Sequence, residues 1–304
     1  MLRVLAPAKL NLFLHVTGKR KDGGYHLLDS LVCFADIGDE LILEAADQFE
    51  FTIAGPFSSQ ISNEDMSGNT VVKAAHLLAA ATGKDLNVKI TLIKNLPSGA
   101  GIGGGSADAA ATLRALQEFW SVSVPEKQLH DIALNIGSDV PVCLESKSVI
   151  MQGTGDILLS APQLPELFAL LIWPGQKAPT LDVFKNRSGA FSSNASLGSF
   201  YNDTETLIDD LTSQTRNDLE LSATELFPII NDALNVLRRE EKCIFARMSG
   251  SGSTVFGLFK NQEELNASAN SIKFSQPNWW VQPCRTTVNQ AGFLKSMTTP
   301  RFLK

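Results

Sequence analysis

The chain has 304 residues, of which 44% are hydrophobic and 19% charged, and its formal net charge is −6. This length and balance fit a globular protein of one large or two ordinary domains. An acidic charge without a run of basic residues argues against nucleic-acid binding, and no apolar window reaches the ~18 residues of a membrane span. Pro7 and Lys9 interrupt the apolar N-terminal segment, so we expect no signal peptide and a cytoplasmic location.

The cysteines and histidines are scattered along the chain. None of Cys33, Cys143, Cys243 and Cys284 belongs to a CxxC pair, and the four histidines also stand apart. Disulfide frameworks and zinc sites need closer, patterned spacing. We therefore expect reduced, structural thiols in a cytosol-like compartment and no cluster of metal ligands.

The first predicted element is a β-strand over residues 3–16, where side chains alternate with a period of two. This alternation places Lys9 and Asn11 on the same face of the strand. The pattern alone leaves open whether Lys9 is a solvated lysine on a half-exposed strand or a functional group.

The next predicted elements are three strands, a helix and a further strand, at 30–35, 40–45, 49–53, 69–82 and 86–93. Residues 36–39, with the sequence DIGD, have the composition of a turn between the first two of these strands. In the helix, apolar side chains recur at helical spacing, and Gly83 is a typical C-terminal stop. The last strand leads directly into a glycine-rich segment.

That segment, LPSGAGIGGGSADAA at 96–110, has five glycines between Gly99 and Gly105 and then becomes alanine-rich. We expect a helix from Ser106 onward, because alanine and leucine favour helices. A glycine loop between a strand and a helix is suited to anions, since free N–H groups and the helix dipole favour phosphate there. The sequence therefore predicts a phosphate-binding loop. A flexible glycine linker is the alternative, and the ordered segments on both sides argue against it.

Three familiar glycine motifs do not match this loop. A Walker A loop requires a Lys and a Ser or Thr after its second glycine, but Gly104 and Gly105 follow Gly103 here. A Rossmann fingerprint would need a third glycine where Ser106 stands. The G-x-S-x-G elbow of serine hydrolases would need glycine in place of Asp108.

Beyond the glycine loop, a helix is predicted at about 125–136, and the segment GSDVP at 137–141 breaks it. Prolines become frequent past residue 160, so we place a change of domain near 155–165. Residues 188–199 are rich in serine, glycine and asparagine and are expected to form a flexible surface loop. Later predicted elements are helices at 204–211 and 227–241 and strands at 244–248 and 254–259, the two strands flanking SGSGS at 249–253.

Several of these motifs together resemble the GHMP kinases, which include galactokinase and the homoserine, mevalonate and phosphomevalonate kinases. PSGAGIGGGSADAA at 97–110 is similar to their ATP-binding loop, and MSGSGSTVFGLF at 248–259 to a third superfamily motif that closes over it. With PAKLNLFLHVTGKRKDGGYH at 7–26, IGSDVPVCL at 136–144 and NDLE at 217–220, the chain resembles the branch that acts on a cytidine-diphosphate-linked alcohol.

The resemblance implies a two-domain α/β (α+β) architecture with the active site in the cleft between the domains. Residues 1–160 would form a ribosomal-S5-like domain and residues 161–304 a ferredoxin-like domain. The implied reaction transfers the γ-phosphate of ATP, which arrives with Mg²⁺, to the 2-hydroxyl of 4-diphosphocytidyl-2-C-methylerythritol in non-mevalonate isoprenoid biosynthesis. This small molecule is then the expected partner, with no nucleic acid and no membrane, and the sequence leaves the oligomeric state open.

By the same resemblance, Lys9 and Asp139 match the catalytic pair of the family. An aspartate has an ordinary pKa near ~3.9, so Asp139 would be ionised at neutral pH and could accept the proton of the substrate hydroxyl or orient it. Lys9 would hold that carboxylate in its charged form and stabilise the transferring charge. From the sequence alone, Asp139 could equally be a helix N-terminal residue before Val140 and Pro141.

The resemblance also assigns binding residues. Asn11 matches a substrate-contacting position, while Tyr25 and His26 match a cytidine-binding segment in which the ring stacks and the histidine bonds the base edge. Phe184 is a candidate for the opposing aromatic face, although a core phenylalanine is an open alternative. The nucleotide-binding residues implied are Asn69 on the adenine side and Pro97, Ser98, Gly99, Ala100, Gly101, Ile102, Gly103, Gly104, Gly105, Ser106 and Ala107.

Two departures from the family pattern affect these expectations. The family usually has DGYH, whereas this chain has an additional glycine at positions 23–24 before Tyr25. Relatives often have serines where Gly104 and Gly105 stand, one of which can contact magnesium, so no protein ligand of Mg²⁺ is assigned.

Two other functions remain open at this point. Another GHMP kinase could act on mevalonate, homoserine or a sugar, but such acceptors have no use for the aromatic and histidine of GYH. A non-catalytic nucleotide-binding module could keep the fold, but the presence of both Lys9 and Asp139 argues against it.

Overall fold

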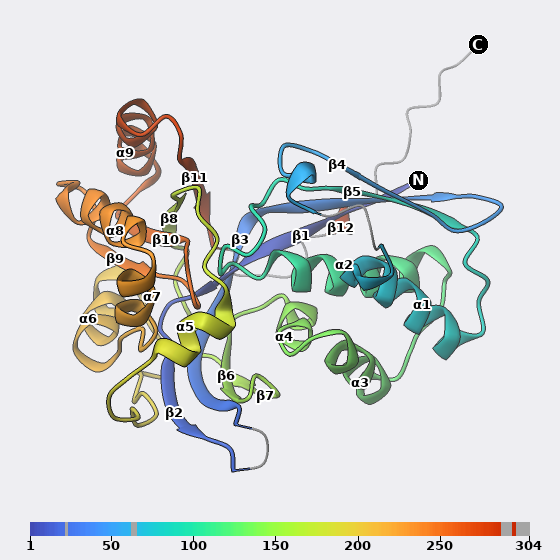
Figure 1. Ribbon diagram of the computed structural model, residues 1–304, viewed down its shortest axis with the longest axis horizontal. Coiled ribbons are helices and arrows are strands. Elements are labelled where there is room, and N and C mark those ends of the chain that lie inside the picture. The colour runs from blue at the N-terminus through green and yellow to red at the C-terminus, as the bar shows by residue number, and fades with distance from the viewer. Residues whose placement is uncertain (22–23, 62–65, 287–293, 296–304) are drawn as a thin grey trace.

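The computed structural model describes residues 1–21, 24–61, 66–286 and 294–295. Two β-sheets form its framework, one with the helices of the N-terminal half and one with the helices of the C-terminal half (Figure 1). Within the described residues, no helix is both long enough and apolar enough to cross a lipid bilayer.

The first sheet is built around one long strand. Its eight strands are β1 (Leu2–Asn11), β2 (His15–Lys19), β3 (His26–Ala45), β4 (Glu50–Ala54), β5 (Val88–Ile93), β6 (Val149–Gly153), β7 (Ile157–Ser160) and β12 (Leu294–Lys295). The main order is β12-β1-β3-β5-β4, with β2, β6 and β7 off this path. Strand β3 has 20 residues and pairs antiparallel with β1, β2, β5 and β6.

The strand predicted over residues 3–16 is two strands, β1 and β2, separated at residues 12–14. At this break the backbone of Leu14 bonds to the second half of the chain. Its N–H donates to the carbonyl oxygen of Arg216, and its carbonyl oxygen accepts from the N–H of Asp218. Alternation continues across the break, so the sequence shows one run where the structure has two strands.

The turn predicted at residues 36–39 is wrong, because these residues continue β3. Gly38 lies close to β1, and a Cβ atom there would lie 2.1 Å from the carbonyl oxygen of Ala6. Asp39 is fully buried and bonds to Lys94. Gly38 allows β1 and β3 to approach closely, and Asp39 forms a buried ion pair with Lys94. Both residue types are also favoured in turns, which is why the sequence predicted one here.

The helices of the first half are α1 (Thr70–Thr82), α2 (Gly104–Phe119), α3 (Glu126–Ile136) and α4 (Val140–Glu145), with 3-10 turns at Ser58–Gln60 and Met66–Gly68. The predicted ends of α1 are confirmed. Asn69 caps the helix by accepting from the N–H of Val71, and Gly83 ends it with a φ of 65°. Helix α2 starts two residues before the predicted Ser106, because Gly103 is its N-cap with a φ of 67°.

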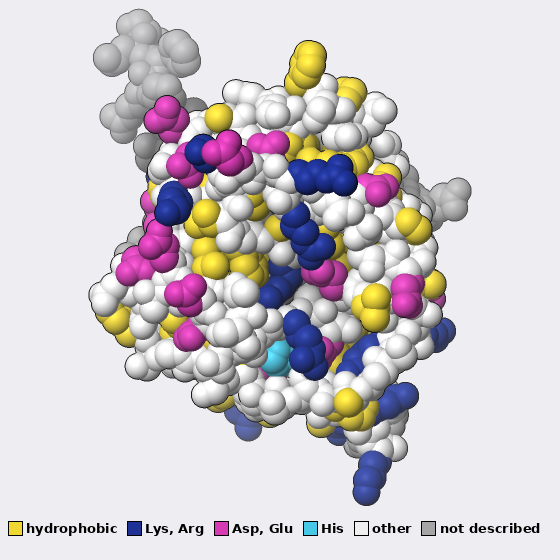
Figure 2. All heavy atoms as spheres, turned by 90° about the vertical axis from the view of Figure 1, so that its left-hand side faces the viewer, with side chains coloured by type: hydrophobic (Ala, Val, Ile, Leu, Met, Phe, Trp, Pro, Cys, Tyr) yellow, Lys and Arg dark blue, Asp and Glu magenta, His cyan; other side chains and the backbone are white. Residues whose placement is uncertain are grey.

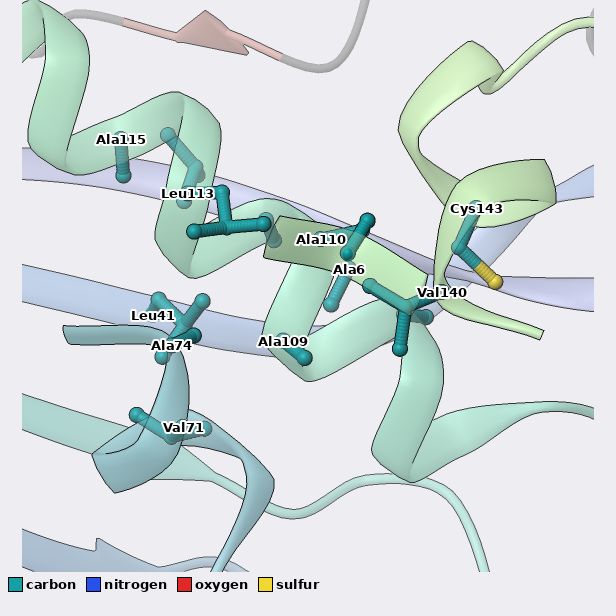
Figure 3. Packing of buried hydrophobic residues seen from close by; sticks show 14 of the residues in the cluster. Ala6, Leu41, Val71, Ala74, Ala109, Ala110, Leu113, Ala115, Val140 and Cys143 are labelled. Atoms are coloured by element: carbon teal, nitrogen blue, oxygen red, sulfur yellow. The ribbon is translucent and has the colours of Figure 1, made fainter. Parts of the chain in front are cut away.

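Small side chains allow α2 to pack closely on the sheet. Ala109 and Ala110 lie in the core with Leu113, among residues that include Ala6 of β1 and Leu41 of β3 (Figure 3). All five side chains are fully buried. The alanine-rich segment therefore fixes the helix whose N-terminus follows the glycine loop.

The second sheet has four strands in the order β11-β8-β10-β9, with all neighbours antiparallel. Its elements are β8 (Phe168–Trp173), α5 (Thr180–Asn186), α6 (Thr204–Gln214), α7 (Glu220–Leu226), α8 (Ile229–Arg239), β9 (Phe245–Met248), β10 (Val255–Phe259), α9 (Gln262–Ser275) and β11 (Trp280–Arg285). Strand, helices, two strands, helix and strand in this order form the βαββαβ pattern of a ferredoxin-like domain, which confirms that expectation. The predicted elements at 204–211, 227–241, 244–248 and 254–259 correspond to α6, α8, β9 and β10.

The chain leaves the first sheet at Ser160 and enters the second at Phe168. This passage lies beside the predicted change of domain, but strand β12 returns to pair with β1 of the first sheet. The division into residues 1–160 and 161–304 stays a prediction.

Candidate active site

A lysine–aspartate pair lies where the first sheet meets α4. Lys9 Nζ donates to Asp139 Oδ2 at 2.6 Å. Lys9 comes from β1, while Asp139 occupies the N-cap position of α4, so its expected place at a helix N-terminus is observed and its catalytic role stays a prediction. The Lys9 side chain is 5% exposed and that of Asp139 is 38% exposed. The lysine is therefore sealed in the protein, whereas its partner can be reached from outside.

Lys9 keeps its charge in this setting. Burial alone would lower its pKa, but the attraction of Asp139 and Cys143 and the hydrogen bond to Asp139 outweigh burial and raise the pKa above its ordinary value. The lysine is thus a permanent cation at neutral pH, and its ammonium holds the Asp139 carboxylate in place.

The glycine loop runs beside Lys9. The backbone N–H of Lys9 donates to the carbonyl oxygen of Ile102 at 2.9 Å, and a Cβ atom on Gly103 would lie 3.0 Å from Lys9 Cβ. Gly99, Gly101 and Gly103 have φ angles of 68°, 75° and 67°, a region that favours glycine. The loop then enters α2, whose first backbone N–H groups lack acceptors within the helix. This is a backbone cradle of the kind that holds phosphate.

The segment 249–254 of the second domain lies against this loop. Thr254 N–H donates to the carbonyl oxygen of Ala100 at 3.0 Å, and Ser249 Oγ donates to that of Gly101 at 3.2 Å. A Cβ atom on Gly101 would lie 2.5 Å from the carbonyl oxygen of Gly252, so only glycine fits there. The two motifs meet backbone to backbone, as the resemblance implied.

Asn11, the last residue of β1, contacts both the segment 249–254 and strand β3. Its backbone N–H donates to Ser249 Oγ at 3.2 Å, and its Nδ2 donates to Ser30 Oγ at 2.8 Å. Its Oδ1 is buried and has no hydrogen-bond partner among the residues that the structure describes. A buried acceptor without a donor is costly, so this atom is available to a hydroxyl donor.

The predicted nucleoside residues form a second cluster. The His26 and Phe184 rings stack with their centroids 5.0 Å apart and an interplanar angle of 25°, and Tyr25 is 69% exposed. Partial burial first, and then the positive charges of Lys19 and Arg187, lower the pKa of His26. Of the preceding DGG segment, Asp22 and Gly23 lie outside the described residues.

Helix α5 connects this cluster to the glycine loops. It carries Phe184, and Thr180 at its start has its Oγ1 3.0 Å from Ser251 Oγ.

Lysine and arginine side chains are concentrated along a hollowed face of the molecule, next to a histidine (Figure 2). A polyanionic ligand would be attracted to such a face.

Asn69 lies beside the start of α2. Its side chain caps α1, and the next residue, Thr70, donates from Oγ1 to the carbonyl oxygen of Gly105 at 2.8 Å. On the other side of the loop, Ser98 N–H donates to Gln60 Oε1 at 2.9 Å. The predicted nucleotide residues are therefore contiguous in space.

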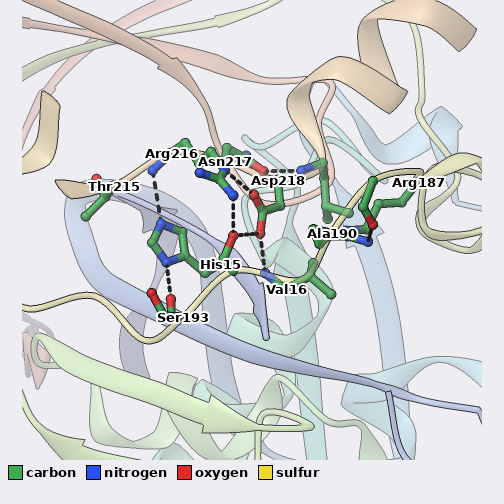
Figure 4. A network of polar contacts seen from close by, with 12 residues as sticks. His15, Val16, Arg187, Ala190, Ser193, Thr215, Arg216, Asn217 and Asp218 are labelled. Carbon is green, nitrogen blue, oxygen red and sulfur yellow. Dashed lines mark hydrogen bonds and ion pairs between the residues drawn. The ribbon is translucent and has the colours of Figure 1, made fainter. Parts of the chain in front are cut away.

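Residues 188–199 contain no helix or strand, yet hydrogen bonds tie them to both domains (Figure 4). His15 Nδ1 lies 2.9 Å from the carbonyl oxygen of Ser193, and Ala195 N–H donates to Asp29 Oδ2 at 2.7 Å. Ser192 Oγ donates to Asp218 Oδ2 at 2.6 Å, and Asp218 Oδ2 also accepts from Val16 N–H. The segment is a strap between the domains.

The sequence did not identify Asn217 as a structural part of the site. Its Nδ2 donates to the carbonyl oxygens of Met248 and Gly250, each at 2.8 Å, and its Oδ1 accepts from Leu219 N–H. Asn217 therefore shapes the loop that covers the glycine loop. The NDLE motif was the available signal, but its contacts lie about thirty residues away along the chain.

Comparison with known proteins gives the family. Residues 69–147 match the model of the GHMP kinases N terminal domain, and residues 193–276 match that of the GHMP kinases C terminal domain. The chain is 44% identical over 280 residues to the 4-diphosphocytidyl-2-C-methyl-D-erythritol kinase of Paramagnetospirillum magneticum, covering 92% of this chain and 96% of that protein. The corresponding enzyme of Rhodospirillum rubrum is 43% identical over 280 residues, covering 92% of this chain and 91% of that protein.

Solved structures agree with these matches. A crystal structure of 4-(cytidine 5'-diphospho)-2C-methyl-D-erythritol kinase has a TM-score of 0.78 and 30% identity, and covers 94% of this chain and 99% of its own. The homoserine kinase of Cytophaga hutchinsonii has a TM-score of 0.68 at 18% identity, covering 96% of both chains, and at that identity the likeness shows the fold alone.

Proposed function

Because this chain belongs to the 4-diphosphocytidyl-2-C-methyl-D-erythritol kinases of the GHMP kinase superfamily, we propose a role for each residue of its site in that reaction. The protein is an ATP-dependent kinase of isoprenoid biosynthesis, and its acceptor is 4-diphosphocytidyl-2-C-methyl-D-erythritol. The pair Lys9–Asp139 beside the glycine loop carries the mechanism.

In this mechanism the 2-hydroxyl of the acceptor attacks the γ-phosphorus of ATP. The new O–P bond forms as the bond from the γ-phosphorus to its bridging oxygen breaks, and ADP leaves with that electron pair. An Asp139 carboxylate oxygen accepts the hydroxyl proton. Lys9 Nζ, 2.6 Å from Asp139, holds the carboxylate in place and stabilises charge on the transferring group.

The backbone of residues 97–107 would hold the ATP phosphates, with Asn69 on the adenine side. The support is the left-handed conformation of Gly99, Gly101 and Gly103, which side chains rarely adopt, and the helix start behind the loop, which presents N–H groups. Mg²⁺ would arrive on the phosphates of ATP and offset their charge. Among the described residues, no group of three or more His, Cys, Asp or Glu side chains could hold the ion. We therefore assign it no protein ligands.

The acceptor would be held by Asn11 and by the second cluster. Asn11 Oδ1, buried without a donor, can accept a hydroxyl hydrogen bond from the erythritol part. The lowered pKa of His26 favours its neutral ring, which has one donor and one acceptor nitrogen for the cytosine edge. Tyr25 and Phe184 would provide aromatic faces for the base, and the exposed Tyr25 must approach it on binding.

An ADP-release assay on a panel of acceptors tests this assignment. The panel contains 4-diphosphocytidyl-2-C-methyl-D-erythritol, mevalonate, homoserine and galactose. We expect turnover of the first alone. Turnover of another member would overturn the acceptor, and ATP binding without turnover of any member would indicate a non-catalytic nucleotide-binding protein.

A further inference from the structure

A buried ion cluster lies directly behind the start of α2. Lys94 Nζ donates to Asp39 and, at 2.8 Å, to Asp108 Oδ2. The exposed fractions of the Lys94, Asp39 and Asp108 side chains are 2%, 0% and 3%. Lys94 directly follows β5, Asp39 lies in β3, and Asp108 lies in the second turn of α2. These three residues are called the buried cluster below. The mechanism above does not use them.

The buried cluster holds the start of the glycine-loop segment. Asp39 Oδ1 accepts from the N–H groups of Asn95 at 2.6 Å and Leu96 at 2.8 Å. These residues immediately precede Pro97, the first residue of the loop. A carboxylate that accepts two backbone N–H groups fixes the path of that backbone.

The same cluster holds the end of the loop. A Cβ atom on Gly104, the first residue of α2, would lie 3.5 Å from both Asp39 Oδ2 and Lys94 Nζ. One turn further along, Asp108 of α2 bonds to Lys94. The two ends of the loop are thus joined through one lysine and two carboxylates.

The chemistry of the cluster is unlike that of an ordinary core. Replacing a buried ion cluster by apolar side chains is often neutral or stabilising, so stability alone gives it little justification. Within the described part of the chain, Asp108 Oδ1 is moreover buried without a hydrogen-bond partner. What the cluster supplies is a fixed geometry at both ends of a loop made flexible by its glycines.

We infer that Lys94, Asp39 and Asp108 are positioning residues for ATP, which fix both ends of the glycine loop and so determine nucleotide affinity without touching the nucleotide. This inference rests on the proposed binding of ATP by residues 97–107. It predicts a selective effect, because the residues that hold the acceptor lie on other segments.

The test measures the affinity for a non-hydrolysable ATP analogue by calorimetry, together with the KM for ATP and for the acceptor. Asp39→Asn removes the ionic contact with Lys94 while its Oδ1 can still accept the two N–H groups. Asp108→Asn is the milder change. Asp29→Asn is the matched control, since Asp29 is a buried aspartate on the same strand, bonded to Gln152 and Ala195.

We expect Asp39→Asn to weaken analogue binding and raise the KM for ATP by roughly tenfold, with the acceptor KM changed by less than about twofold. Asp108→Asn should shift the same quantities in the same direction. A purely structural role would reduce the folded fraction, which lowers the maximal rate but leaves both KM values unchanged. Unchanged analogue affinity in both variants, or an equal effect from Asp29→Asn, would overturn the inference.

A further variant separates this inference from the proposed function. Gly103→Ala places a side chain at a left-handed position, 3.0 Å from Lys9 Cβ, and should weaken analogue binding directly. If Gly103→Ala binds the analogue normally, the loop itself is not the nucleotide site. If Gly103→Ala binds weakly but Asp39→Asn binds normally, only the role of the buried cluster is overturned.

Discussion

Two lysine–aspartate clusters flank the glycine loop, and they differ mainly in access to water. In the pair Lys9–Asp139 the carboxylate side chain is 38% exposed, whereas no side chain of the buried cluster exceeds 3%. Both clusters keep a lysine charged with carboxylates, yet only Asp139 can be reached by a substrate.

The comparison shows that the same residue types can have different roles, depending on whether their side chains are exposed to solvent. A carboxylate with one open side can exchange its lysine partner for a substrate hydroxyl within a catalytic cycle. A carboxylate sealed against a lysine cannot, because any rearrangement leaves a buried charge unpaired. The pair Lys9–Asp139 is thus suited to catalysis, whereas the buried cluster is suited to holding the backbone around it in place.

The largest expected effect comes from breaking the exposed pair. Asp139→Asn and Lys9→Ala should each lower kcat by at least ~10²-fold, the scale of losing a catalytic group, while the fold persists. Steady-state kinetics and circular dichroism of the same samples check this. Lys147→Ala is the control, since Lys147 forms a surface pair with Glu145 at the other end of α4 and should keep its kcat. Near-wild-type rates in either site variant would remove that residue from the mechanism.

Breaking the buried cluster should act on stability. Lys94→Met leaves the buried Asp39 carboxylate without its cation, so the free energy of unfolding should fall by about 3–5 kcal/mol. Urea unfolding measures the change, and Lys147→Ala should lose no more than ~1 kcal/mol because its pair is exposed. A loss in Lys94→Met as small as that of Lys147→Ala would mean that the buried and exposed clusters do not differ energetically.

The pH dependence of stability gives a further test of the buried cluster. Burial, together with the nearby charge of Asp39, raises the pKa of Asp108 to about 8 despite the opposing effect of Lys94. Between pH ~4 and ~8 the folded protein keeps a proton that the unfolded chain releases, so this group makes stability fall as pH rises. Relative to Asp108→Asn, the wild type should lose stability from pH 5 to pH 8, by at most ~1.4 kcal/mol per pH unit. A difference that stays constant with pH would show that Asp108 is already ionised.

The smallest expected effect lies outside both clusters. Tyr25→Ala should raise the acceptor KM by up to roughly tenfold, the value of one aromatic stacking contact, and leave kcat and the KM for ATP nearly unchanged. Initial rates with each substrate varied in turn measure this, with Tyr25→Phe retaining the wild-type value. An unchanged acceptor KM in Tyr25→Ala would exclude stacking on this ring.

Features encoded within a few neighbouring residues could be predicted from the sequence. The extent of α1 with its stop at Gly83, the glycine loop and the shared strand of Lys9 and Asn11 are of this kind. The proposed roles of Lys9 and Asp139 came from family resemblance, and their contact joins residues 130 positions apart. Amino-acid composition alone does not indicate that Lys9 and Asp139 are in contact.

Features that depend on distant partners could not be predicted. Residues 36–39 have the composition of a turn, but the contact of Asp39 with Lys94, 55 positions away, holds them in a strand. Likewise, residues 188–199 have a loop composition that says nothing of their bonds to Asp29 and Asp218. Periodicity also missed α9 and four shorter elements of six or seven residues, β8, β11, α5 and α7, in which a periodic pattern is weak.

The bond from Thr254 N–H to Ala100 joins the covering segment of one domain to the nucleotide loop of the other. Moving the two domains apart as rigid bodies would break this backbone tie and open the tight contact between Gly101 and Gly252. These contacts therefore join the two domains at the loop that we propose holds ATP. We therefore expect nucleotide exchange to use local motion of these loops, which is faster than the movement of a whole domain.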